Sequence, residues 1–322
     1  MEPIAAKNLT IGVCHPAYRI EPVIRQRLPE TRVFQESTTS AIEKRMPKID
    51  LLVISGAWHN SLLKGAERLK WIQSIGVGFD QFPLDELKSC GIRLSNATGV
   101  NANAVSEHAM ALILALVRRL HEACQNRQRR HWQPMISNPE DREDELGGKT
   151  LGIIGLGTIG NRLAIFGKAF DMRVIGTKGN PATYRGVVDD VLPPERLDDL
   201  LKVANFVVVC CPLKADTIDL IGAAELAHMR PSSYFVNVAR GPVVVEADLI
   251  SALQEGKISG AVLDVTIDEP LAPDSPLWQM NNVLITPHTG GETSYYEKRL
   301  VDIIVENIRH WERREPFVHQ IV

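Results

Sequence analysis

The chain has 322 residues, of which 44% are hydrophobic and 23% charged, and its formal net charge is −3 at pH 7. This length predicts two domains at about 150 residues each, and the nearly balanced charge argues against nucleic acid or an anionic membrane as a partner. The longest apolar stretch, residues 109–117, is less than half of the ~20 residues that a membrane span needs.

The cysteines and the amino terminus predict the compartment. Five cysteines (Cys14, Cys90, Cys124, Cys210 and Cys211) are an odd number in no metal-ligand spacing. The adjacent pair Cys210 and Cys211 lies in an apolar run that is typical of small buried thiols. The first ten residues, MEPIAAKNLT, lack the apolar core of a secretion signal. We therefore expect a reduced, cytoplasmic protein without a metal site.

The first hundred residues alternate short apolar runs with polar, helix-compatible stretches. The runs predict strands at residues 9–13, 31–34, 51–54, 71–75 and 92–94, and the stretches predict helices at 21–28, 39–46 and 84–89. Strands separated by helix-length connections are typical of βαβ units with right-handed crossovers. We therefore expect an α/β fold with a doubly wound parallel sheet.

A long helix and a polar arm interrupt this alternation. Asn101 or Asn103 can cap a helix that runs to about His121. Its apolar residues form one broad stripe: Val105, Ala109, Ala111, Leu112, Ile113, Leu114, Leu116 and Leu120. Such a helix is buried, and we expect it between two domains. The arm, residues 122–148, carries a basic and an acidic cluster, which predicts either a solvated segment or a contact between subunits.

A second alternation begins at Thr150. It predicts strands at residues 150–154, 173–175, 206–210, 234–238, 260–263 and 283–285. The last segment, residues 292–314, reads as an amphipathic helix with Leu300, Ile303, Ile304 and Ile308 facing inward. This helix follows the second sheet but can pack on the first, which would make the first domain discontinuous.

A glycine motif gives the sharpest indication of a ligand. Gly155, Gly157 and Gly160 follow a strand-like segment and precede a helix-like one. In this context Gly155 permits a tight turn, Gly157 lets the backbone approach a pyrophosphate, and Gly160 allows close packing of helix on strand. The pyrophosphate then lies at the positive end of the helix dipole. The alternative is a glycine-rich turn without a ligand.

The position that selects the dinucleotide is unusual. About twenty residues after the glycines, an NAD-binding unit carries an acid that binds the ribose hydroxyls. Here Lys178 takes that place, and no acid lies between Arg173 and Val188. A cation attracts a 2′-phosphate, so the sequence favours NADP(H) and leaves NAD(H) as the second choice. The alternative is a solvated lysine at a strand end.

Three polar residues follow three later predicted strands. Arg240 precedes Gly-Pro, Glu269 precedes Pro270, and His288 precedes Thr-Gly-Gly. Ligands of open α/β sheets bind outside the carboxyl ends of the strands. Together the three residues supply an anion clamp, an acid and a proton carrier.

Five segments resemble signatures of the D-isomer-specific 2-hydroxyacid dehydrogenase family, in that family's order. They are NATGVNANAVSEHAMALILAL, LGGKTLGIIGLGTIG, MRPSSYFVNVARGPVVVEADLISAL, GAVLDVTIDEP and NVLITPHTGG. The resemblance covers nearly the whole chain. The members of the family that the chain resembles are glyoxylate and hydroxypyruvate reductases. Lys178 departs from the pattern, because many NAD-using members have Asp there.

The resemblance implies a Rossmann cofactor domain, residues 101–290, inserted in a discontinuous flavodoxin-like substrate domain, residues 1–100 and 291–322. It also implies a cleft between the domains and a homodimer through the cofactor domain. The implied catalytic residues are Arg240, Glu269 and His288, and the backbone amides of Val77 and Gly78 would hold the substrate carboxylate together with Arg240 and His288. The implied cofactor contacts are Gly155, Gly157, Thr158, Ile159, Gly160, Thr177, Lys178, Cys211, Pro212, Val238, Ala239, Arg240, Asp264, His288 and Gly290.

The expected reaction is hydride transfer between a nicotinamide and a small 2-oxo or D-2-hydroxy acid. Arg240 would polarise the carbonyl, and His288 would donate a proton to the nascent alkoxide, while Glu269 would favour the protonated imidazole. Formate and phosphoglycerate dehydrogenases are alternatives within the family, although Glu269 stands where the formate branch has Gln. A dinucleotide-gated scaffold like the C-terminal-binding corepressors is the alternative outside catalysis.

Overall fold

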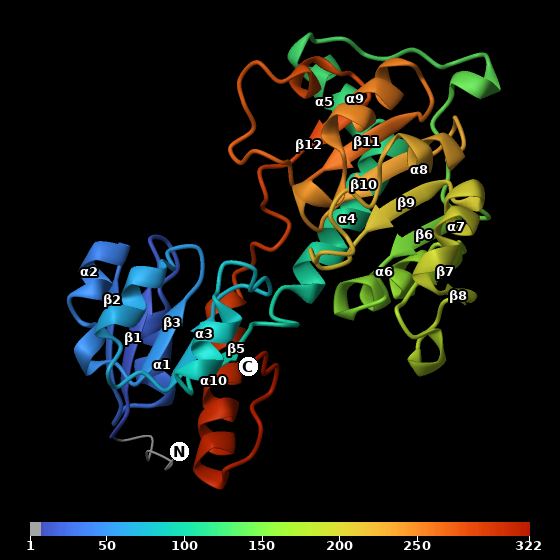
Figure 1. The fold of residues 1–322 in the computed structure, drawn as a ribbon. Coiled ribbons are helices and arrows are strands. Elements are labelled where there is room, and N and C mark those ends of the chain that lie inside the picture. Colours follow the sequence, from blue (N-terminus) through green and yellow to red (C-terminus); the bar gives the residue numbers. More distant parts are fainter. Residues whose placement is uncertain (1–7) are drawn as a thin grey trace. The chain divides into compact units, whose positions relative to one another are not determined.

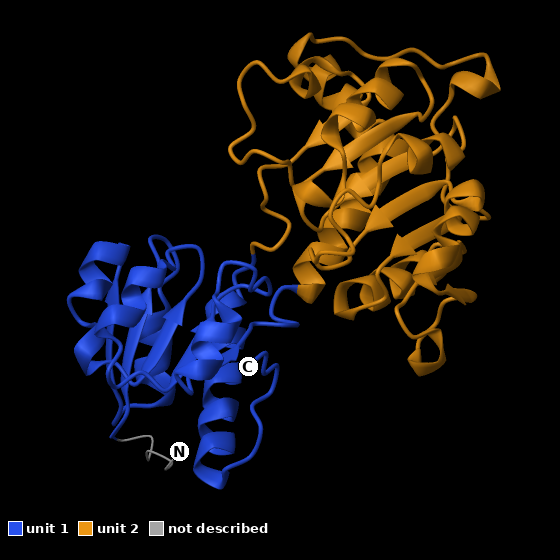
Figure 2. Ribbon diagram, in the orientation of Figure 1, with its two compact units in different colours: residues 1–101, 293–322 blue, residues 102–292 orange. Residues whose placement is uncertain are grey.

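The computed structural model describes residues 8–322, as drawn in Figure 1. Residues 1–7 lie outside the described residues, and with them most of the amino-terminal segment that lacks the apolar core of a secretion signal. The chain forms two compact units (Figure 2): unit 1 is made of residues up to 101 together with 293–322, and unit 2 is made of residues 102–292. No helix in the described part is both long and apolar enough to cross a membrane.

Unit 1 is a five-stranded parallel sheet with helices. Its strand order is β2-β1-β3-β4-β5, which is the flavodoxin-like doubly wound order. The strands are β1 (Thr10–Cys14), β2 (Arg32–Glu36), β3 (Leu51–Ile54), β4 (Trp71–Ser74) and β5 (Arg93–Ser95). The helices are α1 (Ile20–Arg27), α2 (Thr39–Glu43), α3 (Leu84–Ser89) and α10 (Tyr296–Arg313).

Unit 2 is a seven-stranded parallel sheet in the order β12-β11-β10-β9-β6-β7-β8. The chain moves outward from β6 to β8, returns to β9 and continues to β12, which is the Rossmann order with one further strand. The strands are β6 (Thr150–Ile154), β7 (Arg173–Thr177), β8 (Asp190–Leu192), β9 (Phe206–Val209), β10 (Tyr234–Asn237), β11 (Gly260–Leu263) and β12 (Val283–Ile285). The helices are α4 (Ala102–Val117), α5 (Leu120–Gln128), α6 (Thr158–Ala169), α7 (Leu197–Val203), α8 (Ala223–His228) and α9 (Glu246–Gln254).

Both faces of each sheet are buried. In β9, Val207 and Val209 belong to one apolar cluster while Phe206 and Val208 belong to another. In β3, Leu51 and Val53 face the cluster that contains α10, whereas Leu52 and Ile54 face the opposite cluster. Side chains alternate between the faces of a strand, and parallel sheets bury both faces. The predicted fold class, two doubly wound parallel sheets, is therefore confirmed.

The eleven predicted strands are present in residues 8–322, each within two residues of its predicted bounds. The three-residue strand β8 was not predicted, because Asp190 and the two residues after it form no recognisable apolar run. The terminal helix, predicted from residue 292, begins at Tyr296, and the residues before it form turns. Its buried residues include the predicted Leu300, Ile304 and Ile308, with Ile303 partly buried.

The prediction of one helix to about His121 was wrong. Helix α4 ends at Val117, Arg119 takes a left-handed backbone with a φ of 47°, and α5 then begins at Leu120. Leu120 is 52% exposed and Ala111 is also exposed, so the buried stripe is narrower than predicted. The side-chain oxygen of Asn101 accepts no hydrogen bond and so does not cap the helix. Within unit 2 the buried face of α4 packs against α6.

Candidate functional site

The glycine motif lies where the strand order of unit 2 reverses. Gly155 follows β6 with a φ of +104°, a conformation that L side chains rarely adopt. A Cβ on Gly155 would also come within 2.7 Å of the Cys211 backbone nitrogen, at the end of neighbouring β9. The positive φ and the close packing therefore both require glycine at this position. The position lies at the crevice where open α/β sheets bind ligands.

Helix α6 begins directly after this turn. Gly157 is its N-cap, and Thr158 and Ile159 form its first turn. A Cβ on Gly160 would collide with the Gly155 carbonyl oxygen, whereas a Cβ on Gly157 would meet no atom within 4 Å. Packing therefore demands Gly160 but not Gly157. The open space at Gly157, beside the free amides of a helix N-terminus, fits the pyrophosphate of a dinucleotide.

The end of β7 is tied to the same turn. Thr177 is buried; its hydroxyl accepts from the Gly155 amide at 3.1 Å, and its carbonyl accepts from the Leu156 amide at 2.8 Å. Lys178 is half-buried, and its Nζ donates to the Leu156 carbonyl oxygen at 3.0 Å. The lysine charge is therefore held at the glycine turn rather than in open solvent. The pattern of residue types placed Lys178 near the dinucleotide, but it gave no sign of this contact.

The end of β9 supplies an uncharged wall to the turn. Cys211 is 9% exposed, and its burial raises the pKa of its thiol to about 11. Burial raises the pKa of the Cys210 thiol as well. Pro212 follows directly, and its carbonyl accepts from the Thr217 hydroxyl at 2.8 Å. Both thiols are thus protonated near neutral pH. Cys211 is buried, as the apolar run predicted, whereas Cys210 is only partly buried.

Arg240 stands on a fixed turn after β10. Val238 and Ala239 are buried, and the Asn237 side chain accepts from the Ala239 amide and donates to the Arg240 carbonyl, both at 3.0 Å. Arg240 donates from Nη1 to the Ala239 carbonyl at 2.7 Å, which leaves its other N–H groups for a ligand. A Cβ on the next residue, Gly241, would collide with the Thr266 carbonyl, so this turn packs on the loop that carries Glu269.

Glu269 and His288 meet side by side. Strands β10, β11 and β12 are adjacent and parallel, so the residues after them lie along one sheet edge. The Nδ1 of His288 lies 2.7 Å from Oε2 of Glu269, and the two side chains are 43% and 39% exposed. A carboxylate only accepts, so Nδ1 carries the proton of this bond and Nε2 is the end left for a substrate.

Asp264 organises the loop that carries His288. Its backbone carbonyl accepts from the His288 amide at 2.8 Å, and its carboxylate accepts from the Thr289 and Gly290 amides, each at 3.0 Å. Burial would raise the pKa of Asp264, but hydrogen bonds from His108, Thr286 and the Gly290 amide outweigh burial and lower that pKa. The carboxylate is therefore charged at neutral pH and holds the loop firmly.

Unit 1, taken by itself, carries the loop with Val77 and Gly78, which follows β4. The Ser74 hydroxyl contacts the Gly76 and Gly78 carbonyls at 3.0 and 3.3 Å, and the Asn96 side chain donates to the Val77 carbonyl at 2.7 Å. Within the described residues, the amides of Val77 and Gly78 donate to no protein group. A loop with its carbonyls bonded and its amides free can accept a carboxylate. Sequence reasoning named the amides but missed Ser74 and Asn96.

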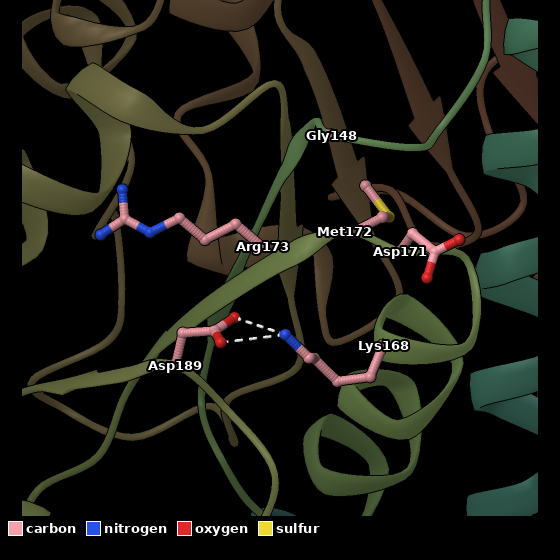
Figure 3. Close-up of a pocket in the computed structure, with 6 residues that line it drawn as sticks. All are labelled: Gly148, Lys168, Asp171, Met172, Arg173 and Asp189. Atoms are coloured by element: carbon pink, nitrogen blue, oxygen red, sulfur yellow. Dashed lines mark hydrogen bonds and ion pairs between the residues drawn. The ribbon is translucent and has the colours of Figure 1, made fainter.

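A separate pocket of about 490 Å³ lies at the opposite edge of the unit 2 sheet (Figure 3), beside the first residue of β7. Lys168 places Nζ 2.9 Å from both carboxylate oxygens of Asp189, and Arg173 pairs with Asp190 at 2.7 Å. The two cations that line this pocket, Lys168 and Arg173, are therefore already paired with carboxylates. Within residues 8–322, no three His, Cys, Asp or Glu side chains are grouped so as to hold a metal ion.

Comparison with known proteins places this geometry in a family. Residues 110–290 match the model of the "D-isomer specific 2-hydroxyacid dehydrogenase, NAD binding domain". A glyoxylate reductase of Aeropyrum pernix is 37% identical over 256 residues, which are 77% of this chain and 74% of that protein.

Two solved structures are also similar. A D-isomer specific 2-hydroxyacid dehydrogenase family protein from Aeromonas salmonicida subsp. salmonicida has a TM-score of 0.85 at 30% identity, and the match covers 98% of this chain and 99% of that one. The NADPH-dependent glyoxylate/hydroxypyruvate reductase of Sinorhizobium meliloti, in complex with NADP and malonate, has a TM-score of 0.80 at 26% identity, covering 98% and 97% of the two chains. The chain therefore belongs to the D-isomer specific 2-hydroxyacid dehydrogenase family and is an oxidoreductase.

Proposed function

We propose that this enzyme reduces a small 2-oxo acid, such as glyoxylate or hydroxypyruvate, to a D-2-hydroxy acid. The observation that carries the proposal is the Glu269–His288 pair at 2.7 Å, which holds a proton-donating imidazole at the sheet edge that also bears Arg240. The names of the glyoxylate reductase of Aeropyrum pernix and the glyoxylate/hydroxypyruvate reductase of Sinorhizobium meliloti support this substrate class.

The residues of this chain have separate parts in the reaction. The bound nicotinamide supplies the hydride for the carbonyl carbon. As the new C–H bond forms, the electron pair of the carbonyl double bond moves to oxygen, and this oxygen takes the proton from Nε2 of His288. The imidazole is left neutral, with its Nδ1 proton still donated to Glu269. In the reverse direction the same nitrogen is the base.

Each unit carries groups that are suited to bind an anion. The guanidinium of Arg240 is always charged and presents a fork that suits a carboxylate or a developing oxyanion. The free amides of Val77 and Gly78 are suited to the substrate carboxylate. In this proposal unit 1 is the substrate domain, while unit 2, which contains the matched NAD-binding segment, is the cofactor domain.

For the cofactor we propose NADP(H) over NAD(H). Lys178 holds a positive charge against the glycine turn, where a carboxylate would otherwise bind the ribose hydroxyls. The S. meliloti reductase was solved with NADP. The Lys178→Asp variant tests this: we expect the preference in kcat/KM to move toward NADH by only about ten- to thirtyfold, because solvent partly screens the charge of a half-buried lysine. A wild type that prefers NADH, or an unmoved ratio, would remove Lys178 from the selection.

A turnover assay tests the activity itself. The purified enzyme is mixed with glyoxylate, hydroxypyruvate, 3-phosphohydroxypyruvate or formate and with either dinucleotide in the matching redox state. We expect rapid oxidation of NADPH with glyoxylate or hydroxypyruvate. Turnover of formate or only of the phosphorylated acid would favour the other dehydrogenases, and dinucleotide binding without any turnover would favour the scaffold.

The arm, residues 122–148 of unit 2, supports a homodimer. It carries Trp132 and Met135, whose side chains are 94% and 98% exposed, beside a hollow of about 650 Å³ lined by four arginines: Arg118, Arg119, Arg127 and Arg130. An exposed tryptophan and methionine beside a charged hollow suit a contact with a second copy. Sedimentation equilibrium checks this state.

The cysteines are all free in the described residues, which suits the cytoplasm, the location we propose.

A further inference from the structure

A polar cluster in unit 2 lies behind the loop that carries His288, and the reaction proposed above does not use it. His108 comes from α4, Asp264 follows β11 and Thr286 follows β12. Nε2 of His108 lies 2.9 Å from the Thr286 hydroxyl, and that hydroxyl lies 2.6 Å from Oδ1 of Asp264. Asp264 is only 4% exposed and His108 is partly buried with a 23% exposed side chain, so the carboxylate end of this cluster lies away from bulk water.

Counting protons fixes the direction of this chain. Asp264 only accepts, because its carboxylate is charged, so the single hydroxyl proton of Thr286 is donated to it. The Thr286 oxygen can then only accept from His108, and Nε2 of His108 must carry a proton. The same Nε2 is 3.4 Å from Oδ1 of Asp264. His108 is thus the outermost donor of a directed chain that ends on the carboxylate.

The carboxylate at the end of that chain sets the backbone next to His288. The two carboxylate oxygens of Asp264 accept from the Thr289 and Gly290 amides, and the backbone carbonyl of Asp264 accepts from the His288 amide. These bonds hold His288 at a φ of 53°, a left-handed conformation that a non-glycine residue keeps only when its surroundings impose it.

The ring of His108 also packs on this loop. A Cβ added to Gly290 would lie 2.7 Å from Oδ2 of Asp264 and 3.0 Å from Cδ2 of His108. The loop therefore has no room for a larger residue at Gly290. Removal of the histidine would both leave the Thr286 oxygen without this donor and open space beside Gly290.

We propose that His108 is a positioning residue, which acts through Thr286 and Asp264 to fix the loop at His288 and so aim Nε2 of His288. This inference rests on the proposed role of His288 as the proton donor. His108 itself neither receives nor gives a proton in the reaction; it supplies one fixed hydrogen bond.

Paired substitutions test the chain. His108→Met removes the donor and Thr286→Val removes the hydroxyl, each at a similar side-chain volume. His108→Gln keeps a donor, and Thr286→Ser keeps the hydroxyl. We expect kcat to fall about tenfold in His108→Met and in Thr286→Val, as for a small misplacement of a catalytic group. The substrate KM and dinucleotide Kd should stay within about threefold of wild type, because neither His108 nor Thr286 is among the residues expected to bind these ligands. The His108→Met/Thr286→Val double variant should be about as slow as either single variant, because both break one chain.

The conservative variants and a matched control complete the test. His108→Gln and Thr286→Ser should recover most of the lost kcat, and His228→Met on α8, a histidine 3.1 Å from Asp198, should match the wild type. Wild-type kcat in His108→Met, losses that multiply in the double variant, or a Gln variant as slow as Met would each overturn the inference. If His108→Met does not fold, the Thr286 pair gives the same comparison. A slow His288→Ala with a normal His108→Met refutes this inference alone, whereas a fast His288→Ala refutes the proposed function.

Discussion

At the scale of single residues, the functional histidine is defined by which of its nitrogens is already engaged. Glu269 accepts a hydrogen bond from Nδ1 of His288, with 2.7 Å between Nδ1 and Oε2, which fixes the ring and leaves Nε2 as the donating end. The pair is partly exposed, so a substrate can reach it without unfolding the loop. The negative charge of Glu269 then stabilises the imidazolium that reduction requires.

Glu269→Gln tests that charge. The amide oxygen still accepts from Nδ1, but it no longer stabilises the protonated ring, so the proton needed for reduction is lost at lower pH. We expect the alkaline limb of the pH profile of kcat/KM for reduction to move to lower pH. Glu195→Gln, at an exposed position in a short turn helix, is the control and should leave the profile unchanged. Superimposable profiles for Glu269→Gln and wild type would show that the two residues are not coupled.

Arg240 tests anion binding at the same scale. In Arg240→Ala the charge and the fork are both lost, and we expect kcat/KM to fall by at least ~10²-fold, as for removal of a donor to a developing oxyanion. Arg240→Lys keeps the charge without the bidentate geometry and should leave a weak enzyme of intermediate rate. Steady-state kinetics on folded variants, checked by circular dichroism, make the comparison. An alanine variant with normal kcat/KM would exclude Arg240 from the reaction.

At the scale of elements, the strand ends could be predicted and their contacts could not. The positions of Arg240, Glu269 and His288 after three strands were readable because each follows an apolar run. The short β8 and the break at Arg119 were not readable, because one is too short for a pattern and the other depends on a single backbone angle. His108 was missed because its partner Thr286 lies 178 positions further along the chain.

The end of β9 gives an element-scale prediction about thiol reactivity. The pKa of Cys211 is raised to about 11 by burial, so only ~10⁻³ of this thiol is thiolate at pH 8. We expect iodoacetamide to modify the exposed Cys90 and Cys124 first and Cys14, Cys210 and Cys211 last. Between pH 8 and 9 the rate at Cys211 should rise about tenfold, because the pH stays below the pKa. Mass spectrometry of timed samples measures this order, and early modification of Cys211 would contradict it.

At the scale of the whole molecule, the two ends of the chain build one unit. Periodicity left open which sheet the last helix covers, whereas the family resemblance placed residues 291–322 with residues 1–100. In unit 1, α10 packs against α1 and the buried face of the β1–β3 strands. A polar chain ties the ends together: Asn307 lies 3.4 Å from the Ser95 hydroxyl and accepts from the Val318 amide at 2.7 Å. Periodicity shows that a helix has an apolar face but not which sheet covers that face.

Trp311→Ala tests this joining of the chain ends. Trp311 is 5% exposed, and its ring centroid lies 5.9 Å from that of Phe317 and 6.2 Å from that of Trp71. Its removal should destabilise unit 1 by ~3–5 kcal/mol, the usual loss for a large aromatic residue in a core. Arg313→Ala, at an exposed position of the same helix, is the control. We expect urea unfolding followed by circular dichroism to show an earlier transition in Trp311→Ala only. Equal stability of the two variants would contradict the packing.

The central claim is that His288 donates the proton in reduction of a 2-oxo acid. The most direct measurement is the single-turnover rate of NADPH oxidation by glyoxylate in wild type and His288→Ala, with the dinucleotide Kd measured on the same preparations. We predict a rate lower by ~10²–10⁴-fold in the variant, the usual contribution of a positioned acid, with a Kd within about threefold because the glycine turn binds the dinucleotide. A wild-type rate in His288→Ala would contradict the claim.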